Sequence, residues 1–164
     1  MIRILAERVL HPWAERAMAR RVPDYVIGEP TNPYMRRWWV IPRNRVFNIY
    51  LHEVLRSDDD RALHDHPWVN VSFLIGGGYV EHQIEAGGIE RRYHRLPGSI
   101  VVRRGRCAHR LEIPSGGRAI SLFITGPRLR EWGFHCAKAG WVHWRDFTGG
   151  KNGELIGRGC GEAE

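Results

Sequence analysis

The stretch that decides the fold is Leu-His-Asp-His-Pro-Trp-Val-Asn-Val-Ser-Phe-Leu-Ile, residues 63–75. It places His64 and His66 directly before an apolar run that predicts a buried strand. Side chains two residues apart on an extended chain point to the same face, so the two imidazoles should converge. Convergent imidazoles are typical of a transition-metal site, with ring nitrogens about 2.0–2.2 Å from the ion. A third ligand must come from a distant strand, and His109 is the candidate.

Apolar runs of the same kind recur along the chain, each bounded by Gly, Pro, Asn or Asp. They cover residues 38–41, 47–55, 69–75, 79–84, 89–96, 99–102, 109–113 and 119–125. This rhythm predicts an all-β fold, a small antiparallel barrel or sandwich. Two glycine-rich segments, Ala86-Gly87-Gly88 and Pro114-Ser115-Gly116-Gly117, have the composition of hairpin turns.

The flanks of the predicted barrel, which spans about 36–125, differ from it in texture. Residues 1–23 alternate charged and aliphatic side chains, and Pro12 is expected to open a short helix that runs to about Arg21. Residues 126–148 are rich in Trp, Phe and Gly, and we expect a loop-rich segment that packs its aromatic rings on the barrel. We expect residues 1–148 to form one domain and the glycine-rich 149–164 to be a flexible tail.

Composition excludes several classes of protein. The 164 residues carry a net charge of +7, and only Lys138 and Lys151 among the 25 basic residues are lysines. An arginine excess permits an anionic partner, because the guanidinium binds carboxylate and phosphate through two hydrogen bonds, but it also arises from coding composition alone. No apolar run approaches the roughly 18–20 residues that a membrane span needs. Charged residues interrupt the apolar residues at the N-terminus, so we do not expect a signal peptide there. The three scattered cysteines favour a reduced, cytoplasmic setting.

One known family has this arrangement of motifs. His64-x-His66, then Gly77 and Gly78, then Gly98 with His109 eleven residues later, resembles the two motifs of the cupins over about residues 45–125. The resemblance implies a jelly-roll β-barrel that holds a metal through two histidines, a glutamate and a third histidine. Asn70 and Val71 occupy the slots of that glutamate, so the sequence departs from the pattern there.

A site without the glutamate resembles the three-histidine branch of cupins, the thiol dioxygenases related to cysteine dioxygenase. The segment Tyr34-x-Arg36-Arg37 is similar to the region that carries the substrate-carboxylate arginine of that branch. The resemblance therefore implies His64, His66 and His109 as ligands of Fe(II), and Arg36 or Arg37 as the anion clamp. Of the branch's outer Ser-His-Tyr set only Ser121 is present, so a pocket and substrate different from those of cysteine dioxygenase are expected.

Further candidates follow from strand alternation. Tyr50 and His52 share the polar face of one predicted strand, and we assign them to the pocket wall as candidate catalytic groups. Asn70 and Ser121 are candidate substrate contacts. Cys107 and Glu81 are both candidates for a fourth ligand. The alternative for Cys107 is a small buried thiol, and the alternative for Glu81 is a solvated carboxylate on a strand. Asp65 should point away from the two ligands that flank it. The arginines of 91–106 are interpreted as charge that protects a strand edge.

These features favour a metal-dependent, dioxygenase-like enzyme that acts on a small anionic molecule. Fe(II) is the expected cofactor, with nickel, zinc or manganese as alternatives. The competing hypotheses are a cupin that binds or senses a ligand without catalysis, a non-redox isomerase or epimerase, and a basic nucleic-acid-binding protein with a structural metal. Nucleic acid is an unfavoured partner because the sequence contains no motif of a nucleic-acid-binding fold. We expect no membrane association. A homodimer is a further expectation, because cupins are often dimers.

Overall fold

The computed structural model describes residues 1–58, 62–85, 88–149 and 157–161. Its helical segment at the N-terminus consists of α1 (Ile2–Leu5), the π-helical turn η1 (Ala6–Leu10) and α2 (His11–Arg20), and a short α3 (Trp144–Phe147) lies near the other end. The strands are β1 (Tyr25–Glu29), β2 (Asn32–Trp39), β3 (Asn48–Val54), β4 (Leu63–His64), β5 (Asn70–Gly77), β6 (Tyr79–Ile84), β7 (Glu90–Arg95), β8 (Ile100–Arg103), β9 (His109–Glu112), β10 (Ala119–Thr125), β11 (Gly133–Cys136) and β12 (Gly140–His143).

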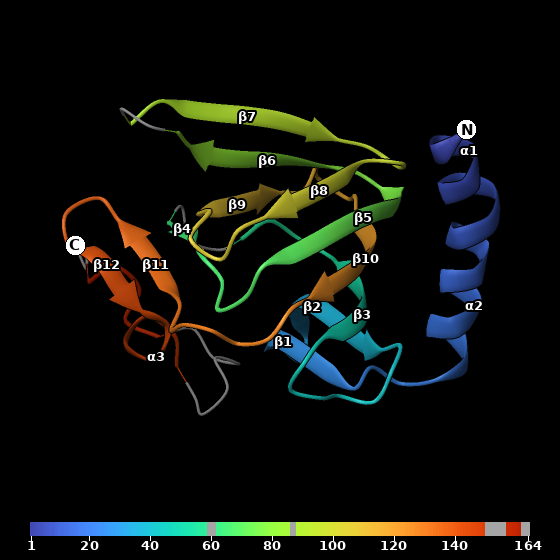
Figure 1. Ribbon diagram of the computed structural model, residues 1–164, viewed down its shortest axis with the longest axis horizontal. Coiled ribbons are helices and arrows are strands. Elements are labelled where there is room, and N and C mark those ends of the chain that lie inside the picture. Colours follow the sequence, from blue (N-terminus) through green and yellow to red (C-terminus); the bar gives the residue numbers. More distant parts are fainter. Residues whose placement is uncertain (59–61, 86–87, 150–156, 162–164) are drawn as a thin grey trace.

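The strands form two antiparallel sheets of six, which confirms the expected all-β class. One sheet has the order β1-β2-β3-β10-β5-β8 and the other β12-β11-β4-β9-β6-β7. The helical segment stands at one side of the barrel, and β11, β12 and α3 gather at the opposite side (Figure 1). Side chains alternate between an outer face and an interior, and the cavity described below lies in that interior.

The outer face of the first sheet is covered by the helical segment. Ala6 and Ala14 are fully buried against Trp38, Leu51 and Ile120, because alanine lets the helix approach the sheet closely. The segment begins at Ile2 rather than at Pro12, so the expected start was wrong. A proline inside a helix lacks one N–H, and the π-helical turn just before Pro12, where the His11 N–H bonds to the Ala6 carbonyl, absorbs the irregularity.

Four strands, β1, β4, β11 and β12, lie outside the apolar runs of the sequence. β1 pairs with a β2 that starts at Asn32, and the bulge between Ile27 and Gly28 is allowed by the positive φ of Gly28. The segment 126–148, expected to be loop-rich, contains the hairpin β11–β12, which turns at Gly140 with φ 71°. Strands of four residues with a glycine at one end carry too little alternation to be recognised.

The cysteines depart from the reduced state expected of them. Cys136 of β11 and Cys160 form a disulfide across 24 residues, and Cys107 is a free thiol. Residues 157–161 of the expected flexible tail are described: the Gly159 N–H bonds to the carbonyl of Phe147, and Cys160 packs beside Phe147. The rest of the tail, 150–156 and 162–164, lies outside the described residues, as do residues 86–87 of one expected turn. Among the described helices, none is long and apolar enough to cross a membrane.

Candidate metal centre and cavity

The three histidines of the sequence pattern come together in the second sheet. His64 ends β4 and pairs with His109, the first residue of β9, while His66 lies two residues beyond β4 and is held by its N–H bond to the Gly105 carbonyl. One nitrogen from each ring lies within 4.8 Å of the other two, and the Nε2 atoms of His66 and His109 are 2.9 Å apart. Two nitrogens bound to one ion at about 2.1 Å and at right angles are themselves about 3 Å apart. The spacing therefore fits a single shared ion.

The electrostatics of these rings also suit metal ligation. Burial, followed by the neighbouring imidazoles and arginines, lowers the pKa of His66 well below its usual value. Burial lowers the pKa of His109 to about 3, against the opposing effect of Glu81. Both rings are therefore neutral at neutral pH, and neutral imidazole is the form that binds a metal.

Behind His109 lies Glu81, a carboxylate with no exposure to solvent. Its Oε1 lies 3.0 Å from His109 Nδ1, at ion-pair distance although outside hydrogen-bond alignment, and it accepts from Arg103 Nε at 2.6 Å. Arg95 Nε donates to Oε2 at 2.8 Å. Burial alone would raise the pKa of Glu81, but His109 and Arg103 outweigh it and hold that pKa far below its usual value. Glu81 is thus an anion that can orient His109 through the nitrogen opposite the shared point.

The other open candidate for a fourth ligand is Cys107. The group of ligand atoms found among the described residues contains the three histidines alone, without Cys107 and Glu81. Burial raises the pKa of the half-buried Cys107 thiol, which favours the protonated form that binds metal poorly.

Asp65 points away from the shared point, as alternation predicts, and fixes the turn that carries the ligands. Its buried carboxylate accepts from the Gly133 N–H at 2.9 Å and from Trp141 Nε1 at 3.1 Å. Arg130 Nη1 lies 3.0 Å from the same carboxylate and also donates to the carbonyl of His66. These contacts attach the ligand-bearing turn to β11 and β12, so the hairpin missed in the sequence supports the site.

A cationic group faces the cavity from the first sheet. Arg37 pairs in register with His52, and Arg37 Nε donates to His52 Nε2 at 2.8 Å. Burial, and then Arg37, lowers the pKa of His52 well below its usual value, so His52 is a neutral acceptor that carries its proton on Nδ1. The Arg37 guanidinium lies 4.8 Å from the centre of the Tyr50 ring. No carboxylate lies at ion-pair distance from Arg37 within the described part of the chain.

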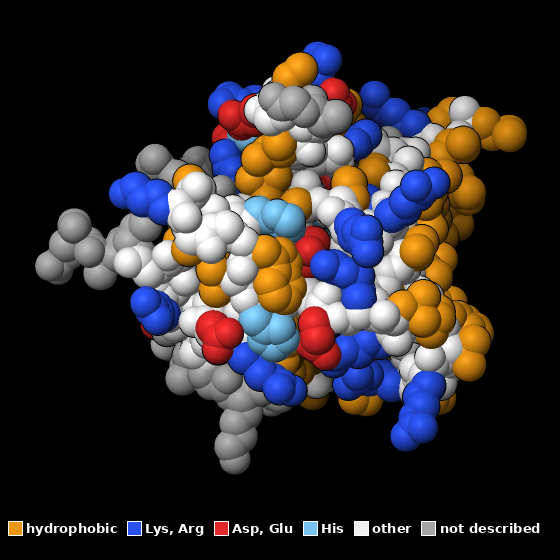
Figure 2. Space-filling view, turned by 60° about the vertical axis from the view of Figure 1, so that its left-hand side comes forward, with side chains coloured by type: hydrophobic (Ala, Val, Ile, Leu, Met, Phe, Trp, Pro, Cys, Tyr) orange, Lys and Arg blue, Asp and Glu red, His pale blue; other side chains and the backbone are white. Residues whose placement is uncertain are grey.

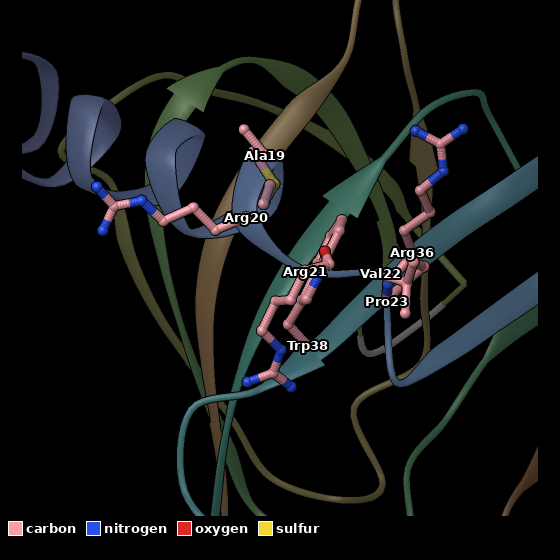
Figure 3. A pocket seen from close by; sticks show the side chains of 8 residues that line it. Ala19, Arg20, Arg21, Val22, Pro23, Arg36 and Trp38 are labelled. Carbon is pink, nitrogen blue, oxygen red and sulfur yellow. The ribbon is translucent and has the colours of Figure 1, made fainter.

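Arg37, His52, Tyr50 and Ser121 line one cavity of about 580 Å³ together with the three histidines. Other predicted contacts lie elsewhere. Arg36 points to the opposite side of β2, where Nη1 pairs with Glu53 at 3.3 Å and the side chain lines a separate depression of about 370 Å³ beside the end of α2 (Figure 3). Asn70 is buried and does not line the cavity, and neither polar atom of its amide has a hydrogen-bond partner among the described residues.

The arginines of 91–106 do not all behave as edge charge. The side chain of Arg103 is 2% exposed and that of Arg95 22% exposed, and both are bound to Glu81, so the expectation was wrong for these two. Arg91 pairs with Glu85 at the exposed edge, as expected. Figure 2 shows basic side chains in several separate groups, with acidic and histidine side chains among them.

No family model matches the sequence, and no curated protein does. Among solved structures, a cupin-2 domain protein from Rhodospirillum rubrum has a TM-score of 0.48 at 15% identity, covering 63% of this chain and 69% of that one. An oxalate decarboxylase from Lactobacillus farciminis has a TM-score of 0.47 at 15% identity, covering 60% and 30%. The iron(II) form of HppE in complex with substrate has a TM-score of 0.51 at 13% identity, covering 65% of this chain and 57% of that one. The two six-stranded antiparallel sheets of this chain thus have a fold similar to that of HppE.

At these identities the likeness concerns the fold alone. The chain spans little more than half the length of the HppE structure that it matches. The likeness therefore concerns the barrel, and the three histidines on the wall of its interior are an observation on this chain alone.

Proposed function

We propose that this chain binds one divalent transition metal through His64, His66 and His109, and that it is a metal-dependent enzyme acting on an organic anion. The observation that carries the proposal is the convergence of three imidazoles on the wall of a cavity that also contains Arg37, which has no carboxylate at ion-pair distance among the described residues. Bound Fe(II), the metal we favour, would supply redox chemistry toward dioxygen, since three protein ligands leave coordination positions open.

The residues of the chain have distinct roles in this proposal. Arg37 binds the anionic group of the substrate, and His52 holds the guanidinium in place through its Nε2. Tyr50, beside Arg37, presents a phenol that can donate a proton to bound substrate or accept one from it. The aromatic walls exclude water from the reacting atoms. The hypothesis of dioxygenase chemistry rests on the motif resemblance to the thiol dioxygenase branch. Metal content and oxygen consumption test it in turn.

Metal content is the first test. Protein purified without chelators should contain about one transition metal ion per chain by elemental analysis, and His64→Ala or His109→Ala should remove at least nine tenths of it. His94→Ala, at an exposed histidine of β7, is the matched control and should retain the metal. Wild-type protein that contains no metal, and that takes up none of Fe(II), Ni(II), Zn(II) or Mn(II), would refute the proposal.

Oxygen consumption then separates the reaction classes. Iron-loaded protein should consume dioxygen when supplied with a carboxylate substrate, and Arg37→Gln should lower kcat/KM by at least tenfold. A protein that binds Ni, Zn or Mn in preference to iron and is silent toward dioxygen would favour the isomerase or epimerase alternative. Metal binding without turnover of any kind would favour a ligand sensor.

A further inference from the structure

The cavity is far larger than a small amino acid or thiol acid requires. Its volume of about 580 Å³ lies within the range of roughly 300–1,000 Å³ that is typical of pockets for drug-sized molecules. Its walls come from both sheets and from α3. A molecule of half a dozen heavy atoms would leave most of it unfilled.

The walls next to the three histidines are aromatic. The Trp68 ring lies parallel to His66 at 6.4 Å between centroids, and Phe134 lies 5.9 Å from His64. Trp132 and Trp144, stacked on each other at 5.8 Å, line the same cavity. Flat aromatic walls bury planar apolar groups well, through offset or edge-to-face contacts worth about 0.5–1.5 kcal/mol each beyond burial.

Two rings connect the cationic end of the cavity to the histidine cluster. Arg37 is bound to His52, the His52 ring stacks on Phe123 at 4.8 Å, and Phe123 lies 6.1 Å from His66. A ligand that contacts both Arg37 and the histidines would therefore lie along the faces of His52 and Phe123.

Arg37 provides a cation that favours an anionic end group on the ligand, whereas the Asp58 carboxylate, which also lines the cavity, accepts from the Leu111 N–H and lies 3.7 Å from His64 Nδ1. Arg103 is neutralised by Glu81, whereas Arg37 and Arg43 line the cavity with no carboxylate at ion-pair distance among the described residues. Arg43 lies 5.6 Å from the centre of the Trp39 ring, which also lines the cavity. Arg43 is exposed but Arg37 is partly buried, and a partly buried cation without a counter-ion is stabilised when a ligand supplies a carboxylate.

We propose that the substrate is an extended aryl carboxylate: its carboxylate lies on Arg37, its aromatic body lies between Phe123 and the tryptophans, and its far end reaches the three histidines. The assignment rests on the proposed function, because it names the substrate class of that site. It predicts that recognition depends on the length and the planarity of the acid, and that a small thiol acid binds poorly.

Binding to the metal-free protein tests this class without reference to the metal. Calorimetry should show that biphenyl-4-carboxylate binds at least tenfold more tightly than its neutral isostere biphenyl-4-carboxamide and than 3-mercaptopropionate. Arg37→Gln should weaken carboxylate binding at least tenfold, whereas Arg36→Gln, on the other side of β2, should leave it within twofold. The comparison of acid with amide on the wild-type protein needs no variant, so a misfolded Arg37→Gln leaves the test intact.

The outcomes separate the two proposals. Binding of the aryl acid to a protein that takes up no metal would support the ligand class and refute the metal enzyme. Metal uptake together with equal affinities for the acid and the amide, or tighter binding of 3-mercaptopropionate, would overturn the aryl carboxylate and leave the metal site standing. Unchanged affinity in a folded Arg37→Gln would likewise overturn the assignment.

Discussion

Glu81 and His82 are adjacent on β6, and each is buried in a network of charged groups on opposite faces of the strand. On the inner face, Glu81 contacts Arg95, Arg103 and His109. On the outer face, His82 Nε2 lies 2.7 Å from Glu112 and Nδ1 lies 3.0 Å from Glu90. The exposed fraction is 0% for Glu81 and 1% for His82, so burial does not distinguish the two networks.

The difference lies in what each network reaches. The inner network ends on His109, whose other ring nitrogen faces the cavity. The outer network ends on glutamates whose side chains are 53% and 51% exposed, so water can replace those contacts. In this molecule the buried network that reaches the cavity is therefore the one we connect with function, and substitutions in the two networks test that distinction.

The largest effect is expected on metal affinity. Glu81→Gln keeps the size of the side chain but removes the charge that orients His109, and it should weaken metal binding by about 10–100-fold. Glu112→Gln removes the equivalent charge from the outer network and should change metal affinity by less than twofold. Competition with a chromophoric chelator measures both constants. Equal losses in the two variants would remove the distinction between the faces.

The convergence of the three histidines and most strands of the two sheets could be predicted from the sequence, because their signals are local. His64 and His66 are two residues apart, and His109 opens a strand with clear apolar alternation. The role of Glu81 could not be predicted, because it depends on the pairing of β6 with β9, in which Gln83 lies opposite His109. Register between distant strands is a tertiary property that a strand pattern does not contain.

Arg103 and the disulfide show the same limit. Arg103 belongs to an arginine-rich run that has the composition of an exposed edge, yet it lies on the inner face of β8, where it pairs with Glu81. Cys136 and Cys160 are separated by 24 residues with no motif, so only folding shows that they meet. In both cases the role of the residue depends on a partner that is distant in the sequence and becomes its neighbour only in the folded chain.

An intermediate effect is expected from the histidine that faces a cation. His52 accepts from Arg37, and its pKa is lowered below the usual value near 6.5 by burial and by that cation. Below pH 6.5 the unfolded chain therefore binds a proton that the folded chain does not, and stability is lost as the pH falls. The loss from His52 should approach about 1.4 kcal/mol per pH unit, or about 2 kcal/mol at pH 5.

Urea unfolding of metal-free protein at pH 7.5 and pH 5.0 measures that loss. His52→Gln, whose amide oxygen can still accept from Arg37, should lose about 2 kcal/mol less than the wild type over this range. His94→Gln, at an exposed position, should lose as much as the wild type. An identical pH dependence in His52→Gln and wild type would show that this ring is free to take up a proton in the folded protein.

The smallest effect is expected on the outer face. His82→Leu replaces the buried ring by an apolar side chain, and the exposed ends of Glu90 and Glu112 can be solvated by water once the ring is gone. Because replacing a buried ion network by an apolar group is often neutral, the free energy of unfolding should change by no more than about 1 kcal/mol. Metal content and aryl carboxylate affinity should both match the wild type. A loss of metal in His82→Leu would mean that the two faces of β6 are coupled through the strand, and the inner network would then no longer be a separate functional unit.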